Sequence, residues 1–258
     1  MLAFALKKDR AWILAHDDYK LTKKELTVFN HCLTRRLKSK PLAYILGEQE
    51  FYGLPFKVNK NVLIPRPETE KLVDEIAIPS SVAHNDIIVD VGTGSGAIII
   101  SLAKKIKNKN VKYFAIDVSN QALTVAKQNA KLNGVEKNIV FLKGNLLEPI
   151  INNLKIKNSE LKITANLPYL TPAQIAKEKS IQAEPRLALE GGSDGLKYYR
   201  QLAKQLKTIR QAYPHLPISL YCEANPKQMT ALKKIFAGAK TKILKDFRCQ
   251  NRFLLCQF

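Results

Sequence analysis

The sequence has no apolar run long enough to cross a membrane. Its longest run lies around residues 97–103, far short of the roughly 20 residues that a membrane-spanning helix needs. The N-terminus has no basic start, no long apolar stretch and no cleavage site, so we expect no secretory signal. These absences exclude a membrane protein, and we expect a cytoplasmic protein without a membrane partner.

Cysteine is scarce and is not spaced for metal binding. Cys32, Cys222, Cys249 and Cys256 form no CxxC motif, and the histidines show no metal-ligand spacing. We therefore expect buried thiols in a reducing compartment and no metal site. Internal repeats and low-complexity tracts are also absent, and the 46% share of hydrophobic residues excludes a disordered chain.

Acidic residues are the minority charge. The chain has 42 Lys and Arg against 22 Asp and Glu, which gives a net charge of +20. This excess indicates association with a polyanion, with the ribosome or RNA as first candidates. A lysine-rich proteome explains it equally well, because the lysines are scattered. The length of 258 residues allows one catalytic domain with a small appendage, which we expect to be monomeric.

The residue pattern divides the chain into three segments. Residues 1–45 are helical: a capping box at Thr22 begins a helix that Pro41 ends. The predicted apolar face of this helix consists of Leu26, Phe29, Leu33 and Leu37. Residues 46–64 read as a β-hairpin linker. Residues 65–258 begin with a proline-rich turn and then alternate between strands and helices.

Short apolar runs in the third segment predict a seven-stranded sheet. They lie at residues 87–89, 111–116, 139–142, 163–165, 218–222, 241–247 and 252–258. Such runs, separated by helices, are typical of a doubly wound, mostly parallel α/β sheet. The last two runs predict a terminal hairpin with one antiparallel edge strand, and residues 152–160 are predicted as a polar loop. Ligands of such sheets bind at the carboxyl ends of the strands.

A glycine-rich turn follows the first of these strands. It consists of Gly92, Thr93, Gly94, Ser95 and Gly96. Glycines let a ligand approach the backbone beside a helix N-terminus. Asp117 ends the next strand, where a carboxylate can accept hydrogen bonds from ribose hydroxyls. Together these features indicate a nucleoside cofactor, either a dinucleotide or S-adenosylmethionine.

The turn after the fourth strand decides between these cofactors. It reads Asn166, Leu167, Pro168 and Tyr169. An amide, a backbone carbonyl and an aromatic ring suit a planar NH2 group on an sp² carbon. The lone pair of such a nitrogen is delocalised, so acceptors that hold both N–H bonds would aim it at an electrophilic methyl group, and positioning would supply much of the rate. We therefore predict that Asn166, Pro168 and Tyr169 are catalytic.

Longer motifs add to this pattern. They are residues 41–47 (PLAYILG), 62–70 (VLIPRPETE), 90–98 (DVGTGSGAI) and 184–189 (EPRLAL). From about residue 40 onward the sequence resembles the protein-(glutamine-N5) methyltransferases of peptide chain release factors. These are class I S-adenosylmethionine-dependent enzymes. The resemblance implies their fold, with residues 65–258 as the methyltransferase domain and residues 1–45 as a shortened domain that docks the substrate.

The resemblance also implies roles for single residues. Residues 92–96 would hold the methionine part of the cofactor, and Asp117 would hold its ribose. Asn145 and Leu146 would lie beside the adenine, and Asn166 would contact the cofactor as well. The Asn166 oxygen and the Leu167 carbonyl would hold the glutamine amide of a Gly-Gly-Gln loop. Pro168 would fix the turn, Tyr169 would pack on the amide, and residues 66–69 would close over the cofactor.

Other readings stay open because the chain departs from the family pattern. Leu167 replaces the usual proline, and Asn-Leu-Pro-Tyr also occurs in adenine-N6 methyltransferases, so an enzyme acting on RNA or DNA is the alternative. Asn145 replaces an aspartate. A ribosome-associated protein without catalysis and a dehydrogenase fit the residues less well.

Three further pairings are expected to be structural. Glu184 and Arg186 fit either a contact with the substrate or an ion pair that fixes a loop beside the site, and we favour the ion pair. Asp90 is expected to order the glycine turn through its backbone amides. Asp246 and Arg252 are expected to stabilise the terminal hairpin.

Overall fold

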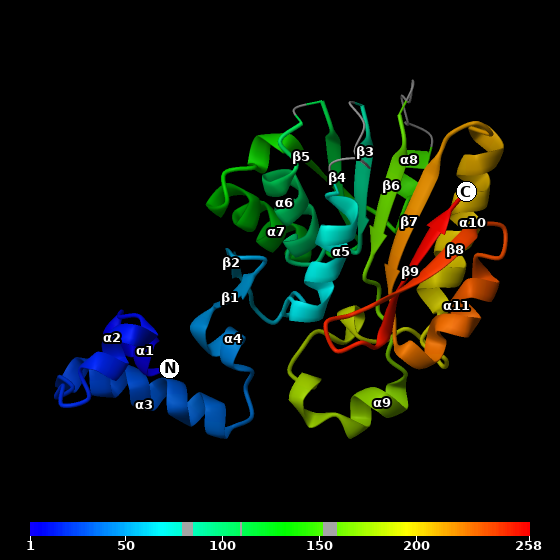
Figure 1. The fold of residues 1–258 in the computed structure, drawn as a ribbon. Coiled ribbons are helices and arrows are strands. Elements are labelled where there is room, and N and C mark those ends of the chain that lie inside the picture. The colour runs from blue at the N-terminus through cyan, green and yellow to red at the C-terminus, as the bar shows by residue number, and fades with distance from the viewer. Residues whose placement is uncertain (79–84, 109, 152–158) are drawn as a thin grey trace.

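The computed structural model describes residues 1–78, 85–108, 110–151 and 159–258 (Figure 1). Most of the predicted loop at residues 152–160 lies outside these ranges. Within them, no helix is both long enough and apolar enough to span a membrane.

All seven predicted strands form, and they make one sheet (Figure 1). They are β3 (Ile87–Val91), β4 (Lys112–Asp117), β5 (Ile139–Lys143), β6 (Leu161–Ala165), β7 (Ile218–Glu223), β8 (Lys240–Lys245) and β9 (Asn251–Gln257). The spatial order is β5-β4-β3-β6-β7-β9-β8. The first five strands in this order are parallel, whereas β9 pairs antiparallel with both β7 and β8. The predicted antiparallel edge is therefore confirmed, with β9 as the inner of the last two strands.

Two hydrophobic cores cover the two faces of the sheet. The helices on one face are α5 (Glu70–Ile76), α6 (Ala97–Lys105) and α7 (Asn120–Leu132). The helices on the other face are α8 (Glu148–Ile151), α10 (Lys197–Ala212) and α11 (Met229–Ile235). Side chains alternate between the cores, so that Ile88 belongs to the first and Val89 to the second. The remaining short helices are η1 (Pro67–Thr69), η3 (Glu136–Asn138), α9 (Pro172–Lys177), η4 (Lys179–Ile181), η5 (Arg186–Ala188) and η6 (Pro226–Gln228).

The predicted hairpin forms and docks on α7. Its strands are β1 (Glu48–Phe51) and β2 (Leu54–Lys57). Asn129 of α7 bonds to both backbone groups of Lys57, at 2.7 and 3.0 Å. The same Asn129 amide donates to the carbonyl of Ser95 at 2.9 Å. The hairpin, the helix and the glycine turn are thus held together by one buried side chain.

The N-terminal helices are α1 (Leu2–Leu6), α2 (Arg10–Ala15), α3 (Lys23–Leu37) and α4 (Leu42–Leu46). Thr22 caps α3 through the predicted capping box. The prediction that Pro41 ends this helix is wrong: α3 ends at Leu37, because Ser39 turns left-handed at φ 61°, and Pro41 instead precedes α4. This left-handed turn closes the helix before the proline is reached.

The apolar face of α3 is only partly covered, contrary to a simple amphipathic reading. Leu26 is 45% exposed and Leu37 is 78% exposed. Within residues 1–40, burial is confined to Ala5, Leu6 and Cys32. The first three helices therefore have little core of their own, and in Figure 1 they lie apart from the sheet.

Candidate active site

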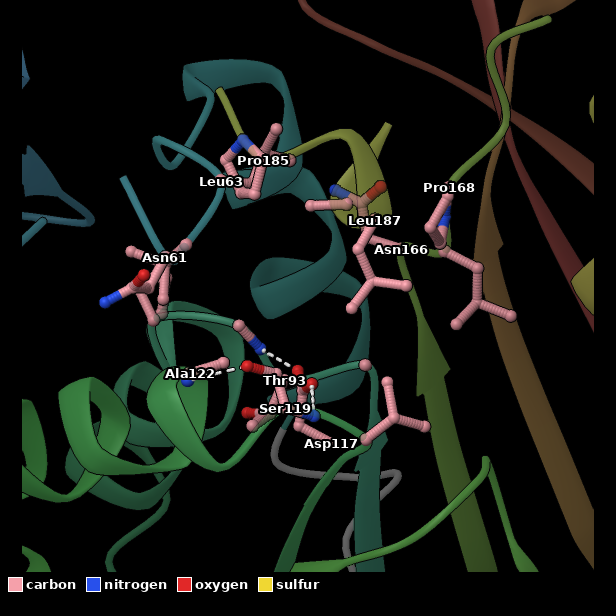
Figure 2. A pocket seen from close by; sticks show the side chains of 18 of the residues that line it. Asn61, Leu63, Thr93, Asp117, Ser119, Ala122, Asn166, Pro168, Pro185 and Leu187 are labelled. Atoms are coloured by element: carbon pink, nitrogen blue, oxygen red, sulfur yellow. Dashed lines mark hydrogen bonds between the residues drawn. The ribbon is translucent and has the colours of Figure 1, made fainter. Parts of the chain in front are cut away.

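A cavity of about 350 Å³ lies at the carboxyl ends of β3, β4 and β6 (Figure 2). The predicted residues that line it are Gly92, Thr93, Gly94, Ser95, Asp117, Asn145, Leu146, Asn166, Leu167 and Pro168. Of the segment predicted to close over the cofactor, Arg66 and Thr69 also line it, whereas Pro67 and Glu68 do not, and neither do Gly96 and Tyr169. The sheet topology therefore brings together most of the predicted site, although its parts lie in four separate turns of the sequence.

The glycine turn is shaped by close approach of its backbone to other groups. Gly92 has a φ of 71°, and a Cβ atom there would lie 3.1 Å from the Leu167 side chain. Gly96 has a different role, because a Cβ atom there would lie 2.7 Å from Ile100 and 3.2 Å from Ala126. Gly92 thus keeps the turn close to the Asn166–Tyr169 turn, whereas Gly96 allows α6 to pack against α7.

Asp117 ends β4 as predicted and points to the cavity (Figure 2). One carboxylate oxygen accepts from the Gly94 amide at 2.9 Å, and the other accepts from the Ser119 amide at 2.9 Å. The side chain is nearly buried, and burial raises its pKa. Each oxygen keeps a second lone pair, which can accept a ligand hydroxyl.

Asp90 orders the glycine turn, but not through backbone amides of that turn as predicted. Its two oxygens accept from the hydroxyls of Thr93 at 2.7 Å and Thr164 at 2.5 Å. Burial raises the pKa of Asp90 to about 6, while these hydrogen bonds lower it. The side chain is 1% exposed, so hydroxyl donors replace the solvent that this carboxyl has lost.

The loop after β5 is fixed from α10. The two ends of the Gln205 amide bond to the Leu147 amide at 2.8 Å and to the Asn145 carbonyl at 3.1 Å. Between them Leu146 adopts a left-handed φ of 55°. The Asn145 NH2 donates to Glu148 at 3.1 Å, which directs that end of the amide to a partner on the protein. Asn145 and Leu146 remain at the cavity wall.

Asn166 lies between the large cavity and a second one of about 130 Å³. Its Nδ2 donates to Thr69 Oγ1 at 3.2 Å and to Glu223 Oε2 at 3.0 Å. In the described residues no protein donor reaches Asn166 Oδ1. The amide therefore offers a free acceptor at the junction of the two cavities. Tyr169, absent from the large cavity, lines the small one.

The turn that carries Asn166 is supported from behind. The Leu167 amide donates to the Tyr199 hydroxyl at 3.4 Å, and that hydroxyl donates to the Glu223 carbonyl, with the Ala165 carbonyl 3.3 Å away. Gln228 donates to the Tyr169 carbonyl at 2.9 Å. Burial raises the pKa of Tyr169, which the neighbouring Arg252 partly offsets. A proline at position 167 could not donate the first of these bonds.

The segment before η1 is fixed by the predicted glutamate but not by the predicted arginine. Glu184 accepts from the Ile64 amide at 3.0 Å and pairs with Arg66. Arg186 pairs with Glu190, so the expected ion pair between Glu184 and Arg186 is wrong. The reason is that η5 begins at Arg186 and places it one helical turn from Glu190. The expected pair of Asp246 and Arg252 is confirmed at 2.9 Å.

Several residues of the site were not predicted from the sequence, among them Glu223, Tyr199 and Leu187. Glu223 and Tyr199 support the Asn166 turn, and Leu187 forms part of the cavity wall from η5. Glu223 is the last residue of a mostly apolar strand, as Asp117 is of its own strand. Tyr199 reads as one more apolar residue of an amphipathic helix, and nothing in the sequence predicts where its hydroxyl points.

The arrangement is rich in hydrogen-bond acceptors. Asp117 and the oxygen of Asn166 lie at the cavity, and Glu223 lies behind the amide. The described part of the chain contains no group of three or more His, Cys, Asp or Glu residues that could hold a metal ion. The site is therefore suited to a ligand that brings hydroxyl and N–H donors.

Comparison with known proteins gives consistent matches along the chain. Residues 1–47 match the PrmC N-terminal domain, and residues 83–233 match a methyltransferase domain. The release factor glutamine methyltransferase of Flavobacterium psychrophilum is 42% identical, with 96% of this chain and 86% of that protein covered. The enzyme of the same name from Bacillus subtilis is 35% identical, with 98% and 87% covered.

A solved structure shows the same fold at low identity. It is the hMettl16 catalytic domain in complex with the MAT2A 3′UTR hairpin 6, with a TM-score of 0.59 and 16% identity. The match covers 80% of this chain and 76% of that one.

Proposed function

The chain belongs to the release factor glutamine methyltransferase family, and from that premise we propose its reaction in detail. It transfers a methyl group from S-adenosylmethionine to the side-chain amide nitrogen of the glutamine in the Gly-Gly-Gln loop of a bacterial release factor. The observation that carries this proposal is the free Oδ1 acceptor of Asn166 at the junction of two cavities.

The large cavity fits the cofactor. Because Gly92 carries no side chain, the methionine part of the cofactor can approach the backbone of the turn. Asp117 offers acceptors for ribose hydroxyls. Asn145 and Leu146 would lie beside the adenine. When bound, S-adenosylmethionine supplies an electrophilic methyl group. Residues 66–69, held by Glu184, cover the same cavity in part.

The turn after β6 would orient the substrate amide. Asn166 Oδ1 and the Leu167 carbonyl would accept its two N–H bonds, and the Tyr169 ring would pack on its plane. Pro168 limits the freedom of the turn. With both N–H bonds held, the nitrogen lone pair would face the methyl group, and this orientation would lower the barrier. The N–C bond would form as the S–C bond breaks, and the nitrogen would then release one of its two protons to solvent. Asn166, Pro168 and Tyr169 are therefore the proposed catalytic residues.

The same proposal divides the chain into three parts. Residues 1–45 would dock the release factor, residues 46–64 would form the linker, and residues 65–258 would carry the chemistry. The exposed apolar side chains of α3, Leu26 and Leu37, support the docking role because they lack partners within the chain's own core. The boundary at residue 45 falls within α4, which packs on α7.

The remaining proposals concern partners and compartment. We infer a monomeric cytoplasmic enzyme. Free Cys222 and Cys256, on the neighbouring strands β7 and β9, support a reducing compartment. The net charge of +20 supports association with the ribosome or RNA.

A transfer assay tests the substrate. Labelled S-adenosylmethionine is offered with purified release factor, with the same factor whose loop glutamine is changed to alanine, and with ribosomal RNA. We expect label on the intact factor only. Label on RNA only would instead show adenine-N6 methylation, the function that the Asn-Leu-Pro-Tyr turn also permits. Label on both forms of the factor would exclude the loop glutamine as the acceptor.

A further inference from the structure

A buried carboxylate lies behind the Asn166 amide. The Glu223 side chain is 2% exposed, and its Oε2 accepts from Thr69 Oγ1 at 2.7 Å and from Asn166 Nδ2 at 3.0 Å. Asn166 Nδ2 also donates to Thr69 Oγ1 at 3.2 Å. The three side chains form a closed triangle that joins the end of η1, the turn after β6 and the end of β7.

The triangle has only one consistent direction of hydrogen bonding while Glu223 is ionised. A carboxylate only accepts, so the single hydroxyl proton of Thr69 points at Glu223 and its oxygen remains an acceptor. Both groups that face the Asn166 amide then require a donor, which only the NH2 end supplies. With the amide reversed, Oδ1 would face two oxygen atoms in a buried setting, where an unmet hydrogen bond is costly.

We propose that Glu223 is a positioning residue, which holds the Asn166 carboxamide with its oxygen directed to the substrate amide. The inference rests on the proposed role of Asn166 as an acceptor for the glutamine N–H. Glu223 acts through Asn166, and Thr69 completes the triangle. A turn whose amide were free to rotate would present NH2 to the substrate part of the time and lose the alignment.

The charged groups around Glu223 leave it available as an acceptor. Arg66 precedes η1 and Arg252 lies on β9, and each of them pairs with another carboxylate. The charge of Glu68 on η1 raises the pKa of Glu223, and the charge of Glu223 in turn raises the pKa of Tyr169. Burial raises the pKa of Glu223 to about 7, against the effect of the two arginines. Protonation would let the carboxyl donate and remove the single direction of the triangle.

The test compares three variants of the full chain with release factor as substrate. Glu223→Leu removes the acceptor at similar size, Glu223→Gln keeps one acceptor without the charge, and Thr69→Val removes the hydroxyl. Glu160→Leu is the matched control. Glu160 is a partly buried glutamate at the amino ends of β6 and β7, whereas Glu223 lies at the carboxyl end of β7. Kinetic constants, cofactor binding by calorimetry and thermal unfolding are measured for each.

We expect Glu223→Leu to lower kcat about 100-fold, the loss typical of a misplaced reacting group, with cofactor affinity nearly unchanged. Glu223→Gln should recover most of that loss. Wild-type kcat should fall as the pH drops through about 7, and Glu223→Gln should lack this step. Glu160→Leu should lower thermal stability but leave kcat near wild type. Loss of kcat in Glu223→Leu that is matched in Glu160→Leu at equal loss of stability would overturn the proposal.

A readout without substrate separates this proposal from the proposed function. The side-chain NH2 signals of Asn166 are observed by NMR in ¹⁵N-labelled protein and assigned by their loss in Asn166→Asp. They should be protected from exchange in wild type and lose protection in Glu223→Leu and Thr69→Val. Unchanged protection would overturn the positioning role. If wild type leaves the release factor unlabelled while protection is lost in both variants, the substrate is wrong and the positioning role stands.

Discussion

The two ends of β6 carry buried polar groups of opposite design. At the amino end, Lys162 is 1% exposed and pairs with Asp86 at 3.1 Å and with Glu160. At the carboxyl end, Thr164 lies on the same face of the strand and bonds to Asp90, and Asn166 follows. The first cluster matches its carboxylates with a buried cation. The second is a set of acceptors supported by hydroxyl and amide donors.

This difference indicates what each end does. In the first cluster the polar groups are one another's partners, so the cluster holds neighbouring strands together. The acceptor-rich cluster holds carboxyls whose pKa burial has raised, at Asp90, Asp117 and Glu223. Two of these carboxyls, Asp117 and Glu223, line a cavity, where such perturbed groups are candidates for ligand binding. The amino end of β6 is thus held by contacts within the protein, whereas the carboxyl end keeps hydrogen-bond acceptors at the cavities.

Removal of the free Asn166 acceptor, at the carboxyl end of β6, should have the largest effect on activity. Asn166→Ala should lower kcat about 1000-fold, because the loss of one preorganised hydrogen bond to a reacting group costs this much at the upper end of the range. Cofactor affinity should change little, which calorimetry can check. Transfer within a few-fold of wild type, or a loss explained wholly by lost cofactor binding, would contradict the assigned role.

Removal of the buried Lys162 cation, at the amino end of β6, should instead lower stability. Lys162→Met leaves Asp86 and Glu160 without their cation, and we expect the free energy of unfolding to fall by about 3 kcal/mol. Urea unfolding measures this, and kcat of the folded fraction should stay close to wild type. A variant as stable as wild type, or one that is stable but inactive, would remove the contrast between the two ends.

Asp117 should affect binding rather than the chemical step. Asp117→Ala removes the acceptors proposed for the ribose hydroxyls, so the KM for S-adenosylmethionine should rise about 30-fold, equivalent to about 2 kcal/mol. At saturating cofactor, kcat should be nearly restored. Asn145→Ala, in the wall of the same cavity, should have a smaller effect because its amide is neutral. An unchanged KM in Asp117→Ala would place the ribose elsewhere.

The smallest expected effect is on the pH dependence of the free energy of unfolding. The pKa of Asp90 is raised from 3.8 to about 6, so the native state binds a proton that the unfolded state has released. This contribution is fully present below the unfolded value and is lost as the pH rises through about 6. Between about pH 5 and about pH 8, wild type should lose about 1 kcal/mol more stability than Asp90→Asn. Equal slopes in urea unfolding would refute this assignment.

Much of the fold is readable from the sequence because the strands are short apolar runs with polar ends. The helix after Ser119 also begins at a signal that the sequence carries, because the Ser119 side chain accepts from the Ala122 amide as its N-cap. The region before residue 41 is less predictable: its leucines follow a helical period, but too few partners exist to bury them. Periodicity shows which face is apolar and does not show what covers it.

The site is predictable where a residue type at a strand end carries a known chemistry, as with Asp117 and Asn166. It is not predictable where function depends on a contact between distant segments. Thr69 and Glu223 meet across 154 positions of the chain. The wrong pairing of Arg186 has the same origin, since a turn of η5 brings Glu190 nearer than Glu184.

The position of β9 in the sheet has a consequence for how the enzyme is made. β8 precedes β9 in the chain, yet β9 lies between β7 and β8, so β8 has no place in the sheet until β9 has been synthesised. Arg252, which stands beside Tyr169 and Glu223, arrives with that last strand. A nascent chain that already contains the glycine turn and Asn166 therefore still lacks the strand that joins β8 to the sheet and the Arg252 side chain beside Tyr169.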